Sequence, residues 1–271
     1  MDNLSTRFIC LGLLLLCPVL SQASELPSTI HWKKIGDDLQ LAKVEYSPKP
    51  LFVTEIVLLR SSLTRFRVGA IRAAEYGRRT ADVKLLCKAS KAVACINANF
   101  FDENHQSLGL VVQQGITHQK LHRGGKTLTG VFLVTRDAIK IVNRANLPQG
   151  SLIEAVQAGP RLISDGQVLQ ELREKSSLSR RSGICLDRDK RVIFYAVSSG
   201  LLGISIEQLQ ALLVHKAIDC VDALNLDGGG SSQFFLSKDI PGGASATAKE
   251  IFIAGRDAVP VALGLFLRDQ S

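Results

Sequence analysis

Short apolar runs rich in β-branched residues dominate the sequence, and turn-forming residues separate each run from the next. In residues 64–71, "TRFRVGAI", apolar and polar positions alternate, which is typical of a strand with one solvated face. Residues 184–197 hold two apolar runs around a polar turn at 187–190, which predicts a hairpin. This spacing requires a fold built on β-sheet. Strands are predicted at 51–60, 64–71, 92–97, 108–114, 128–135, 139–143, 152–157, 183–187, 191–197, 221–226, 233–236 and 259–267.

Two segments show helical rather than strand periodicity. Residues 80–90 begin at Thr80, a residue type that caps helix N-termini, and their apolar residues lie on one side. Residues 205–217 begin at Ser205, which forms a capping box with Gln208. Many strands with few helices predict an α+β fold: a mixed, mainly antiparallel sheet with a few flanking helices, in a single domain.

The N-terminal segment has the features of a signal peptide. Arg7 precedes an apolar run over 8–20, and Ser21-Gln22-Ala23 supplies the small residues that signal peptidase requires. The run is shorter than the roughly 20 residues that span a bilayer, and a buried helix or an uncleaved anchor is the alternative. We expect a signal peptide over 1–23 and an exported domain over 24–271, periplasmic or secreted, without stable membrane insertion after cleavage.

Four cysteines would remain after cleavage: Cys87, Cys95, Cys185 and Cys220. An even number permits disulfides in an oxidising compartment, but the sequence does not determine their pairing. Free buried thiols are the alternative. No Cys/His spacing indicates a zinc site.

The chain carries a net charge of +8, which suits anionic partners such as phosphorylated glycans and cell-envelope polymers. The basic residues are scattered along the sequence, and no nucleic-acid motif appears among them. We therefore expect no nucleic-acid partner. A solvated basic surface without any specific partner is the alternative.

The segment 96–103, "INANFFDE", places polar side chains at the end of a predicted strand. Asn97 and Asn99 can each donate to and accept from sugar hydroxyls, and the Phe101 ring can pack on a sugar. Asp102 adds a carboxylate. Alternatively, the asparagines cap a turn and the phenylalanines fill the core.

Two arginines stand next to predicted strands and are candidate oxyanion ligands. Arg161 lies in "QAGPRLISDGQV" (157–168), where Asp165-Gly166 predicts the tight turn of a hairpin. Arg181 lies in "LSRRSGICLD" (178–187), at the mouth of a strand, where its side chain would point into a crevice. A surface arginine is the alternative for each.

Residues 223–235, "ALNLDGGGSSQFF", interrupt an apolar run with three glycines and two serines. Asn225 and Asp227 alternate with leucines, so both polar side chains face the same way. Gly228–Gly230 could expose successive amides to an anion, and Ser231 and Ser232 add hydroxyl donors. The motifs of phosphate P-loops, EF-hands and hydrolase nucleophile elbows are absent from this stretch. A glycine turn without a ligand is the alternative.

Taken together and in order, "INANFFD", "QAGPRLISDG", "RRSGICLD" and "ALNLDGGGSS" resemble the motifs of the phosphodiester glycosidase family. The resemblance spans roughly residues 50–268 and is greatest for the bacterial exported branch. Two motifs depart from the family pattern. Asn97-Ala98-Asn99 stands where Asn-Gly-Gly is common, and residues 179–182 read Ser-Arg-Arg-Ser where His-Pro-Arg-Thr is common. These departures weaken a transfer of the family's N-acetylglucosamine specificity to this chain.

The resemblance implies hydrolysis of the C1–O bond of a sugar-1-phosphodiester, with no cofactor and with room for a structural Ca²⁺ or Mg²⁺. Asp227 would be the nucleophile or the base that activates water, and Asp102 is the second candidate carboxylate. Arg181, the amides of 228–230 and Ser231 would hold the phosphate. Asn97 and Asn225 would hold the sugar or orient Asp227.

Two other functions remain open from the residues alone. The first is a non-catalytic module that binds anionic glycans, which needs the basic balance and the glycine turn but no reacting carboxylate. The second is a metal-dependent phosphodiesterase with Asp227 and Asp102 as ligands. The sequence lacks the His-rich spacing that would favour the second.

Overall fold

The computed structural model describes residues 27, 29–49, 52–198, 202–240, 242 and 249–268. The expected signal peptide over 1–23 lies outside the described residues. Within them, the chain is mainly β. Its strands are β1 (Lys33–Gly36), β2 (Leu39–Lys49), β3 (Phe52–Ser61), β4 (Phe66–Arg72), β5 (Ala94–Asn97), β6 (Val111–Gln113), β7 (Ile116–Gln119), β8 (Gly130–Val134), β9 (Ile139–Asn143), β10 (Glu154–Ala158), β11 (Arg161–Ser164), β12 (Gln167–Val168), β13 (Ser182–Asp187), β14 (Val192–Val197), β15 (Cys220–Asn225), β16 (Phe234–Leu236), β17 (Ile251–Ile253) and β18 (Val261–Leu267).

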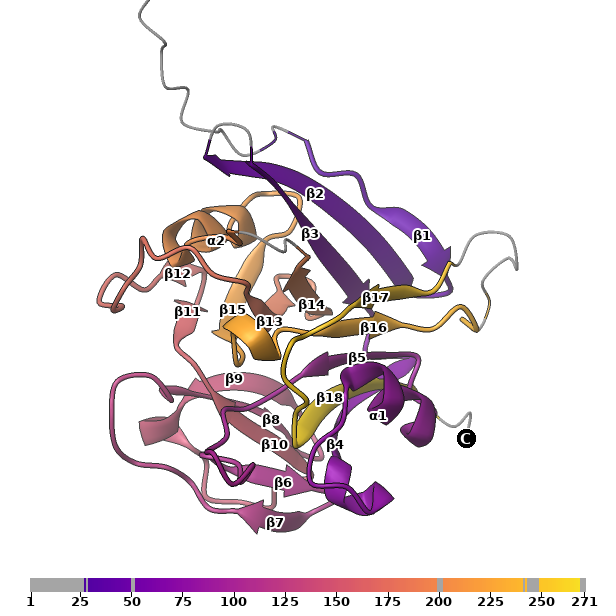
Figure 1. The fold of residues 1–271 in the computed structure, drawn as a ribbon, viewed down its shortest axis with the longest axis vertical. Helices are drawn as coiled ribbons and strands as arrows, with labels where there is room; N and C mark the ends of the chain where they lie inside the picture. The colour runs from indigo at the N-terminus through magenta and orange to yellow at the C-terminus, as the bar shows by residue number, and fades with distance from the viewer. Residues whose placement is uncertain are drawn as a thin grey trace, which may run out of the picture.

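The strands form three sheets (Figure 1). The large sheet has the order β1-β2-β3-β14-β13-β15-β11-β12, and two five-stranded sheets have the orders β7-β6-β10-β8-β9 and β17-β16-β5-β18-β4. Every strand pair among the described residues is antiparallel, so the expectation of a mixed sheet is wrong. Both predicted hairpins are confirmed, as the pairs β13–β14 and β11–β12.

Two eight-residue α-helices accompany the sheets: α1 (Val83–Ser90) and α2 (Ile206–Leu213). The predicted capping box is confirmed, because the Ser205 hydroxyl accepts from the Gln208 amide (3.1 Å) and the Gln208 side chain accepts from the Ser205 amide (3.0 Å). The predicted cap of the first helix is wrong. Asp82 caps α1 by accepting from the Leu85 amide at 2.7 Å. In the described part of the chain, neither helix is long and apolar enough to cross a membrane.

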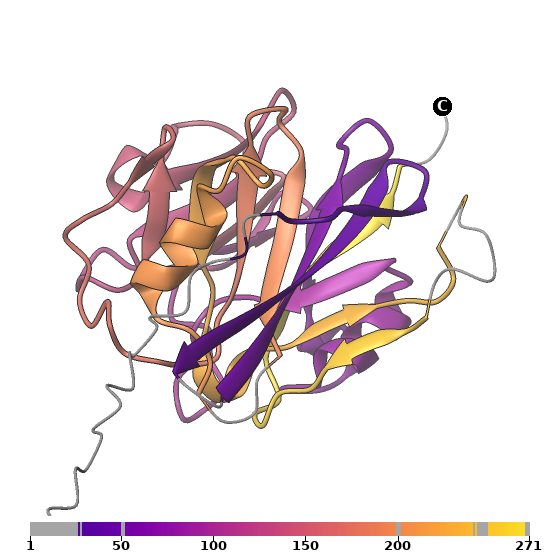
Figure 2. The same ribbon diagram turned by 90° about the horizontal axis from the view of Figure 1, so that it is seen from above.

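The core lies where the three sheets face one another, around the large side chains Phe66, Phe132, Phe194 and Phe234. Helix α2 covers the outer face of the large sheet (Figure 2), where Leu209 and Leu212 belong to a second buried cluster. Helix α1 covers the sheet that contains β5 and β18. Both faces of the central strands are therefore buried, which holds the strand ends rigidly.

Strand β4 departs from the half-solvated pattern that its alternation predicted. Arg67 is exposed, but residues 68–71 are buried on both faces of the strand. Ile71 belongs to the buried cluster that includes helix α1, and the Glu154 carboxylate of β10 accepts from the Ala70 amide at 2.9 Å at the edge of the strand. Helix α1 thus covers the face that the sequence pattern assigned to solvent.

Two disulfides answer the question of pairing that the sequence left open. Cys87 of α1 bonds to Cys95 of β5, and Cys185 of β13 bonds to Cys220 of β15, with Cα–Cα distances of 5.6 and 5.9 Å. The first joins a helix to the sheet that it covers. The second joins the paired strands β13 and β15, of which β15 leads into the glycine turn.

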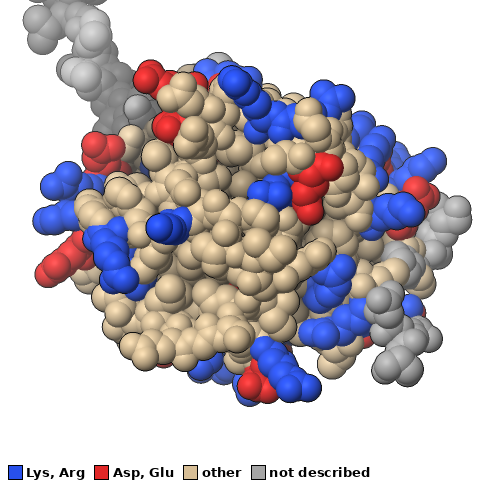
Figure 3. Space-filling view, turned by 90° about the horizontal axis from the view of Figure 1, so that it is seen from below, with Lys and Arg blue, Asp and Glu red and all other residues tan. Residues whose placement is uncertain are grey.

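Lysine and arginine side chains on the face shown in Figure 3 lie in separate groups around a wide area without charge. They do not merge there into one continuous patch, and a few acidic side chains lie among them. This distribution matches the scattered basic residues of the sequence.

Candidate active site

The four sequence motifs meet at one end of the large sheet. Within that sheet β15 lies between β13 and β11, with Gly183 opposite Asn225 and Arg161 opposite Leu224. The first motif comes from the neighbouring sheet: the Asp227 amide donates to the Ala98 carbonyl at 3.0 Å. Because antiparallel neighbours place a strand start beside a strand end, residues far apart in sequence converge here.

Asn97 holds both ends of the glycine turn. Its Nδ2 donates to the Asp227 carbonyl at 2.7 Å, and its Oδ1 accepts from the Gln233 amide at 2.9 Å. The Ser182 hydroxyl donates to the same Asp227 carbonyl at 3.1 Å. Asn97 is fully buried and does not line the cavity described next, so it positions the Asp227 backbone and has no contact with the cavity.

A cavity of about 370 Å³ opens beside the turn, a size typical of small-molecule sites. It holds two carboxylates, Asp227 and Glu174, and three basic side chains, Lys126, Arg173 and Arg181. Opposite charges therefore face one space. The remaining lining residues are Phe100, Thr127, Gly159, Pro160, Leu172, Ser179, Ile206, Asn225, Gly228 and Gly229.

Asp227 has the electrostatics of a functional carboxylate. Burial raises its pKa to about 6, and the negative charge of Asp257 acts in the same direction. Hydrogen bonds from the Ser231 side chain and the Gly228 backbone partly oppose the rise in pKa. A carboxylate that lines a cavity and has a raised pKa is a candidate catalytic group.

Arg181 supplies a cation next to the turn. A Cβ built on Gly228 would lie 3.9 Å from its Nη1, and its Nη2 donates to the Ser177 carbonyl at 3.1 Å. Its buried Nε has no hydrogen-bond partner among the described residues. Burial lowers the pKa of Arg181, and Glu174 opposes that effect. The guanidinium therefore keeps donor capacity close to Asp227.

The preceding residue, Arg180, has a different position. Its Nη2 donates to the carbonyls of Ser232 (2.8 Å) and Ala254 (2.6 Å), and its own carbonyl accepts from the Gly229 amide at 2.9 Å. Arg180 thus ties the glycine turn to the segment before β18. Of these two neighbouring arginines, Arg180 stabilises the turn and Arg181 lines the cavity.

The glycines do not form the anion nest that the sequence predicted. The Gly229 amide donates to a protein carbonyl, and the Gly228 backbone bonds to the Asp227 side chain. Gly230 lies outside the cavity, and a Cβ there would approach an Asp257 carboxylate oxygen to 2.0 Å. The amides of Gly228 and Gly229 stabilise the turn and the carboxylate, and Gly230 admits the Asp257 side chain.

The remaining predicted polar residues of the turn are buried. Asn225 lines the cavity, where its Nδ2 donates to the Gly159 and Leu226 carbonyls and its buried Oδ1 has no partner among the described residues. Ser231 bonds to Asp227 rather than facing the cavity. Ser232 is buried outside the cavity.

Several predicted site residues lie away from this cavity. Asp102 closes its own loop, since its carboxylate accepts from the amides of Asn104 (2.9 Å) and Gln106 (2.8 Å). Asn99 is buried, and its side chain has no partner among the described residues. The Phe101 ring packs on the cluster around α1, while the neighbouring Phe100 lines the cavity.

Arg161 also points elsewhere. Its Nη1 donates to the Ser164 hydroxyl at 3.0 Å, and the acidic side chains near it are Asp165 and Asp222. Its stem covers Gly130, where a Cβ would lie 2.6 Å from the Arg161 Cγ. Arg161 therefore packs on the sheet and does not reach the Asp227 cavity.

Sequence reasoning missed three charged residues of the cavity: Lys126, Arg173 and Glu174. They lie in loops, at 120–129 and 169–181, without strand alternation or helical spacing. Only their local clustering of charge, as in "LREK" (172–175), signalled them. Among the described residues, no group of three or more His, Cys, Asp or Glu side chains is placed to hold a metal ion.

Solved structures share this fold at low sequence identity. The catalytic domain of zebrafish N-acetylglucosamine-1-phosphodiester alpha-N-acetylglucosaminidase is 17% identical with a TM-score of 0.60, over 92% of this chain and 85% of that one. A hypothetical protein from Synechocystis is 17% identical with a TM-score of 0.57, over 89% of this chain but only 64% of that one. A protein from Burkholderia pseudomallei K96243 is 10% identical with a TM-score of 0.56, over 79% and 74% of the two chains.

Curated protein sequences contain no match to this chain. The family model for phosphodiester glycosidases, in contrast, matches residues 90–266, which include all four motifs and every residue that lines the Asp227 cavity. The chain therefore belongs to the phosphodiester glycosidase family.

Proposed function

We propose that this protein is an exported glycosidase that hydrolyses the C1–O bond of sugar-1-phosphodiesters in cell-envelope or extracellular glycans. The observation that carries the proposal is the shared cavity of Asp227 and Arg181, a carboxylate with a raised pKa beside a cation. Membership of the phosphodiester glycosidase family supports the same reaction. The sugar would lie over Asp227 and the phosphate beside Arg181.

The reaction needs opposite charges at its two ends. As the C1–O bond breaks, its electron pair stays on the phosphate oxygen, and C1 becomes oxocarbenium-like. The Asp227 carboxylate stabilises the positive carbon, either as nucleophile or as the base for water. Arg181, Lys126 and Arg173 stabilise the negative charge on the departing phosphate. A water oxygen ends on C1, and the phosphomonoester keeps the bridging oxygen.

Glu174 takes the role that the sequence offered to Asp102. It is the second carboxylate that lines the cavity, whereas Asp102 organises a separate loop. Glycosidases pair two carboxyl groups across the scissile bond. We assign Glu174 as the partner carboxylate that handles the proton of the attacking water or the leaving group.

Export is part of the proposal. The segment 8–20 is apolar behind a basic residue, and both pairs of cysteines after residue 23 form disulfides. Disulfides persist in oxidising compartments and are rare in the cytosol, which supports a periplasmic or secreted location.

The test is hydrolysis of a panel of sugar-1-phosphodiesters in ¹⁸O-labelled water, with products read by mass spectrometry. The expected products are labelled free sugar and an unlabelled phosphomonoester. Asp227→Asn is compared with Asp137→Asn, an exposed aspartate in the β8–β9 turn that does not line the cavity. Only the first variant is expected to lose turnover.

Two results would contradict the proposal. Release of sugar-1-phosphate with the label in its phosphate group, or of unlabelled sugar with a labelled phosphomonoester, would place cleavage at a P–O bond. Tight glycan binding that Asp227→Asn leaves intact, with no turnover on any member of the panel, would favour a non-catalytic binding module instead.

A further inference from the structure

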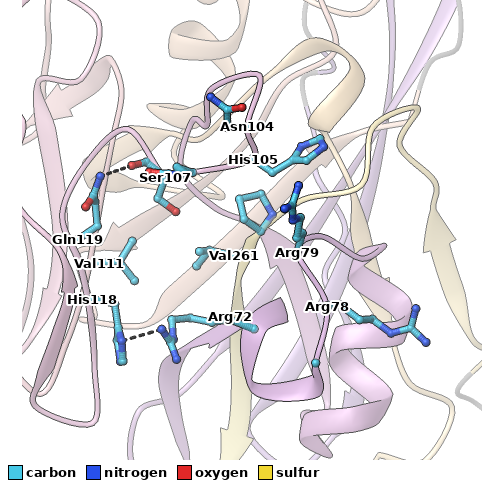
Figure 4. A pocket seen from close by; sticks show the side chains of 14 residues that line it. Arg72, Arg78, Arg79, Asn104, His105, Ser107, Val111, His118, Gln119 and Val261 are labelled. Carbon is cyan, nitrogen blue, oxygen red and sulfur yellow. Dashed lines mark hydrogen bonds between the residues drawn. The ribbon is translucent and has the colours of Figure 1, made fainter.

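A second, larger cavity of about 710 Å³ lies next to the segment that follows β5 (Figure 4). Residues 100–107 connect it to the first cavity: Phe100 lines the Asp227 cavity, and Asn104–Ser107 line this one. The other walls come from residues 72–79, from β6 and β7, and from Pro260 and Val261. Four separate segments of the chain therefore enclose it.

The charged side chains that line this cavity are all basic. The lining includes Arg72, Arg78, Arg79, His105 and His118, and no aspartate or glutamate. Among the described residues, none of the three arginines is within salt-bridge distance of a carboxylate. A concave surface whose cations lack carboxylate partners is suited to a ligand that carries negative charge.

At one end of the cavity, hydrogen bonds hold the side chains of Arg72 and His118 in place. The Arg72 Nη1 lies 2.6 Å from the His118 Nδ1, and the Arg72 Nε donates to the Gln113 Oε1 at 3.0 Å. Arg72 is a donor only, so the neutral His118 ring accepts at Nδ1 and keeps its proton on Nε2. Burial and the charge of Arg72 lower the pKa of His118, and nearby Glu75 opposes them. Glu75 itself accepts from Gln113 (2.7 Å).

The opposite end is built by the loop that Asp102 closes. The His105 amide donates to the Asp102 carbonyl at 2.9 Å, and the His105 ring lies 5.9 Å from the Phe101 ring between centroids. In Figure 4 the His105 and Arg79 side chains lie close together at this end, away from Arg72 and His118. Asp102 and Phe101, which the first cavity leaves unused, thus hold the rim of the second.

Between the two ends the surface is both apolar and polar. In Figure 4, Val111 and Val261 lie between His118 and Arg72 on one side and Ser107 and Asn104 on the other. Gln119 fixes the second side by donating from Nε2 to the Ser107 carbonyl at 2.6 Å. Apolar patches with amide and hydroxyl groups suit a sugar ring, and arginine forks suit phosphate or carboxylate groups.

We propose that this cavity is a second ligand site, which binds a carbohydrate bearing an oxyanion, either a phosphate or a carboxylate. Arg79 and His105 bind at one end and Arg72 and His118 at the other, so the site can hold a ligand with charge at both ends. The site has no carboxylate among its lining residues, so it binds without catalysing glycoside cleavage. The inference goes beyond the proposed hydrolysis and does not depend on it.

The test is titration of the purified protein with glucose 6-phosphate, glucuronate and glucose, followed by NMR of the histidine ring signals. Of the five histidines in the chain, His105 and His118 line the cavity, and their signals are expected to move with the two oxyanion probes but not with glucose. A response to only one oxyanion probe identifies which group the site prefers. A response equal to that of glucose would overturn the oxyanion assignment.

Variants separate this site from the Asp227 cavity. Arg79→Gln is expected to weaken binding of the oxyanion probe about tenfold, the loss of one charge-assisted pair. Arg136→Gln, an exposed arginine in the β8–β9 turn, is the matched control and is expected to bind like the wild type. Matching thermal unfolding midpoints for both variants would exclude a folding defect.

Arg181→Gln provides the second comparison, because a sugar phosphate also suits the first cavity. The shifts of His105 and His118 are expected to persist in this variant. Loss of those shifts in Arg181→Gln together with unchanged binding in Arg79→Gln would overturn the proposal, since the probe would then occupy the Asp227 cavity alone.

Discussion

The two cavities border the same segment, residues 100–107, but differ in charge. The Asp227 cavity is the smaller, at about 370 Å³ against 710 Å³, and it combines two carboxylates with three basic side chains. The larger cavity has basic side chains only. Breaking a C–O bond separates charge and therefore needs both signs, whereas holding an anion needs one. The difference teaches which cavity can perform chemistry and which can only bind.

The largest expected effect is on turnover in the first cavity. Asp227→Asn removes the carboxylate that stabilises the developing charge at C1, and we expect kcat to fall by about 10²- to 10⁴-fold. Steady-state kinetics on a sugar-1-phosphodiester would measure it. The same variant is expected to keep the His105 and His118 shifts with glucose 6-phosphate, and their loss would mean that the cavities are not independent.

The next effect concerns the cation of the first cavity. Arg181→Gln removes a charge beside the departing phosphate, and we expect kcat/KM to fall by about 10²-fold. Arg181→Lys keeps the charge but not the fork, so its loss is expected to be smaller. Equal rates in Arg181→Gln and the Arg136→Gln control would show that the cavity's charge pairing is irrelevant to the reaction.

A stability measurement would sharpen the contrast further. The folded-state pKa of Asp227 is raised to about 6, so its contribution to stability is present at low pH and is lost as the pH rises through 6. Asp227→Asn is therefore expected to raise the free energy of unfolding at pH 8 by about 1 to 3 kcal/mol. Denaturant unfolding at pH 8 and pH 4 would measure it, and a gain confined to pH 4 would contradict the assignment.

The smallest effect, for a change of one pH unit, is the acidic limb of the pH profile. Asp227 must be ionised to act as nucleophile or base, so kcat/KM is expected to fall about tenfold per pH unit below about 6. Rates measured between pH 4 and 8 would test this. A rate that rises on acidification through pH 6 would instead make protonated Asp227 the active form.

The sequence indicated much of the fold but not all of its strands. Alternating and continuous apolar runs located the strands of the core, and the capping box at Ser205 located the start of α2. Residues 33–36, 39–49, 116–119 and 251–253 also form strands, which their residue patterns did not predict. In β7 the whole strand is exposed or half-buried, so no apolar alternation marks it. Pairing with a neighbour, not its own pattern, makes it a strand.

The candidate site was predicted in its centre and missed at its edge. The glycine stretch marked Asp227 and Asn225, and the strand start marked Arg181. The sequence predicted Phe101 as the aromatic residue of the site, but the neighbouring Phe100 lines the cavity. Adjacent side chains point in opposite directions, and only packing decides which of them faces the cavity. Lys126 and Glu174 lie in loops, whose conformation no periodic signal reports.

By itself, the sequence determined the mainly β character, the glycine turn after a buried strand and the carboxylate at its start, because these depend on local backbone preference and apolar spacing. The tertiary structure alone decided which charged side chains share the cavity with Asp227 and which cysteines form disulfides. It also placed Asp102 and Phe101 at a second cavity instead of the first. Such choices depend on which strand ends and loops meet in space, and antiparallel sheets bring together segments that no local pattern connects.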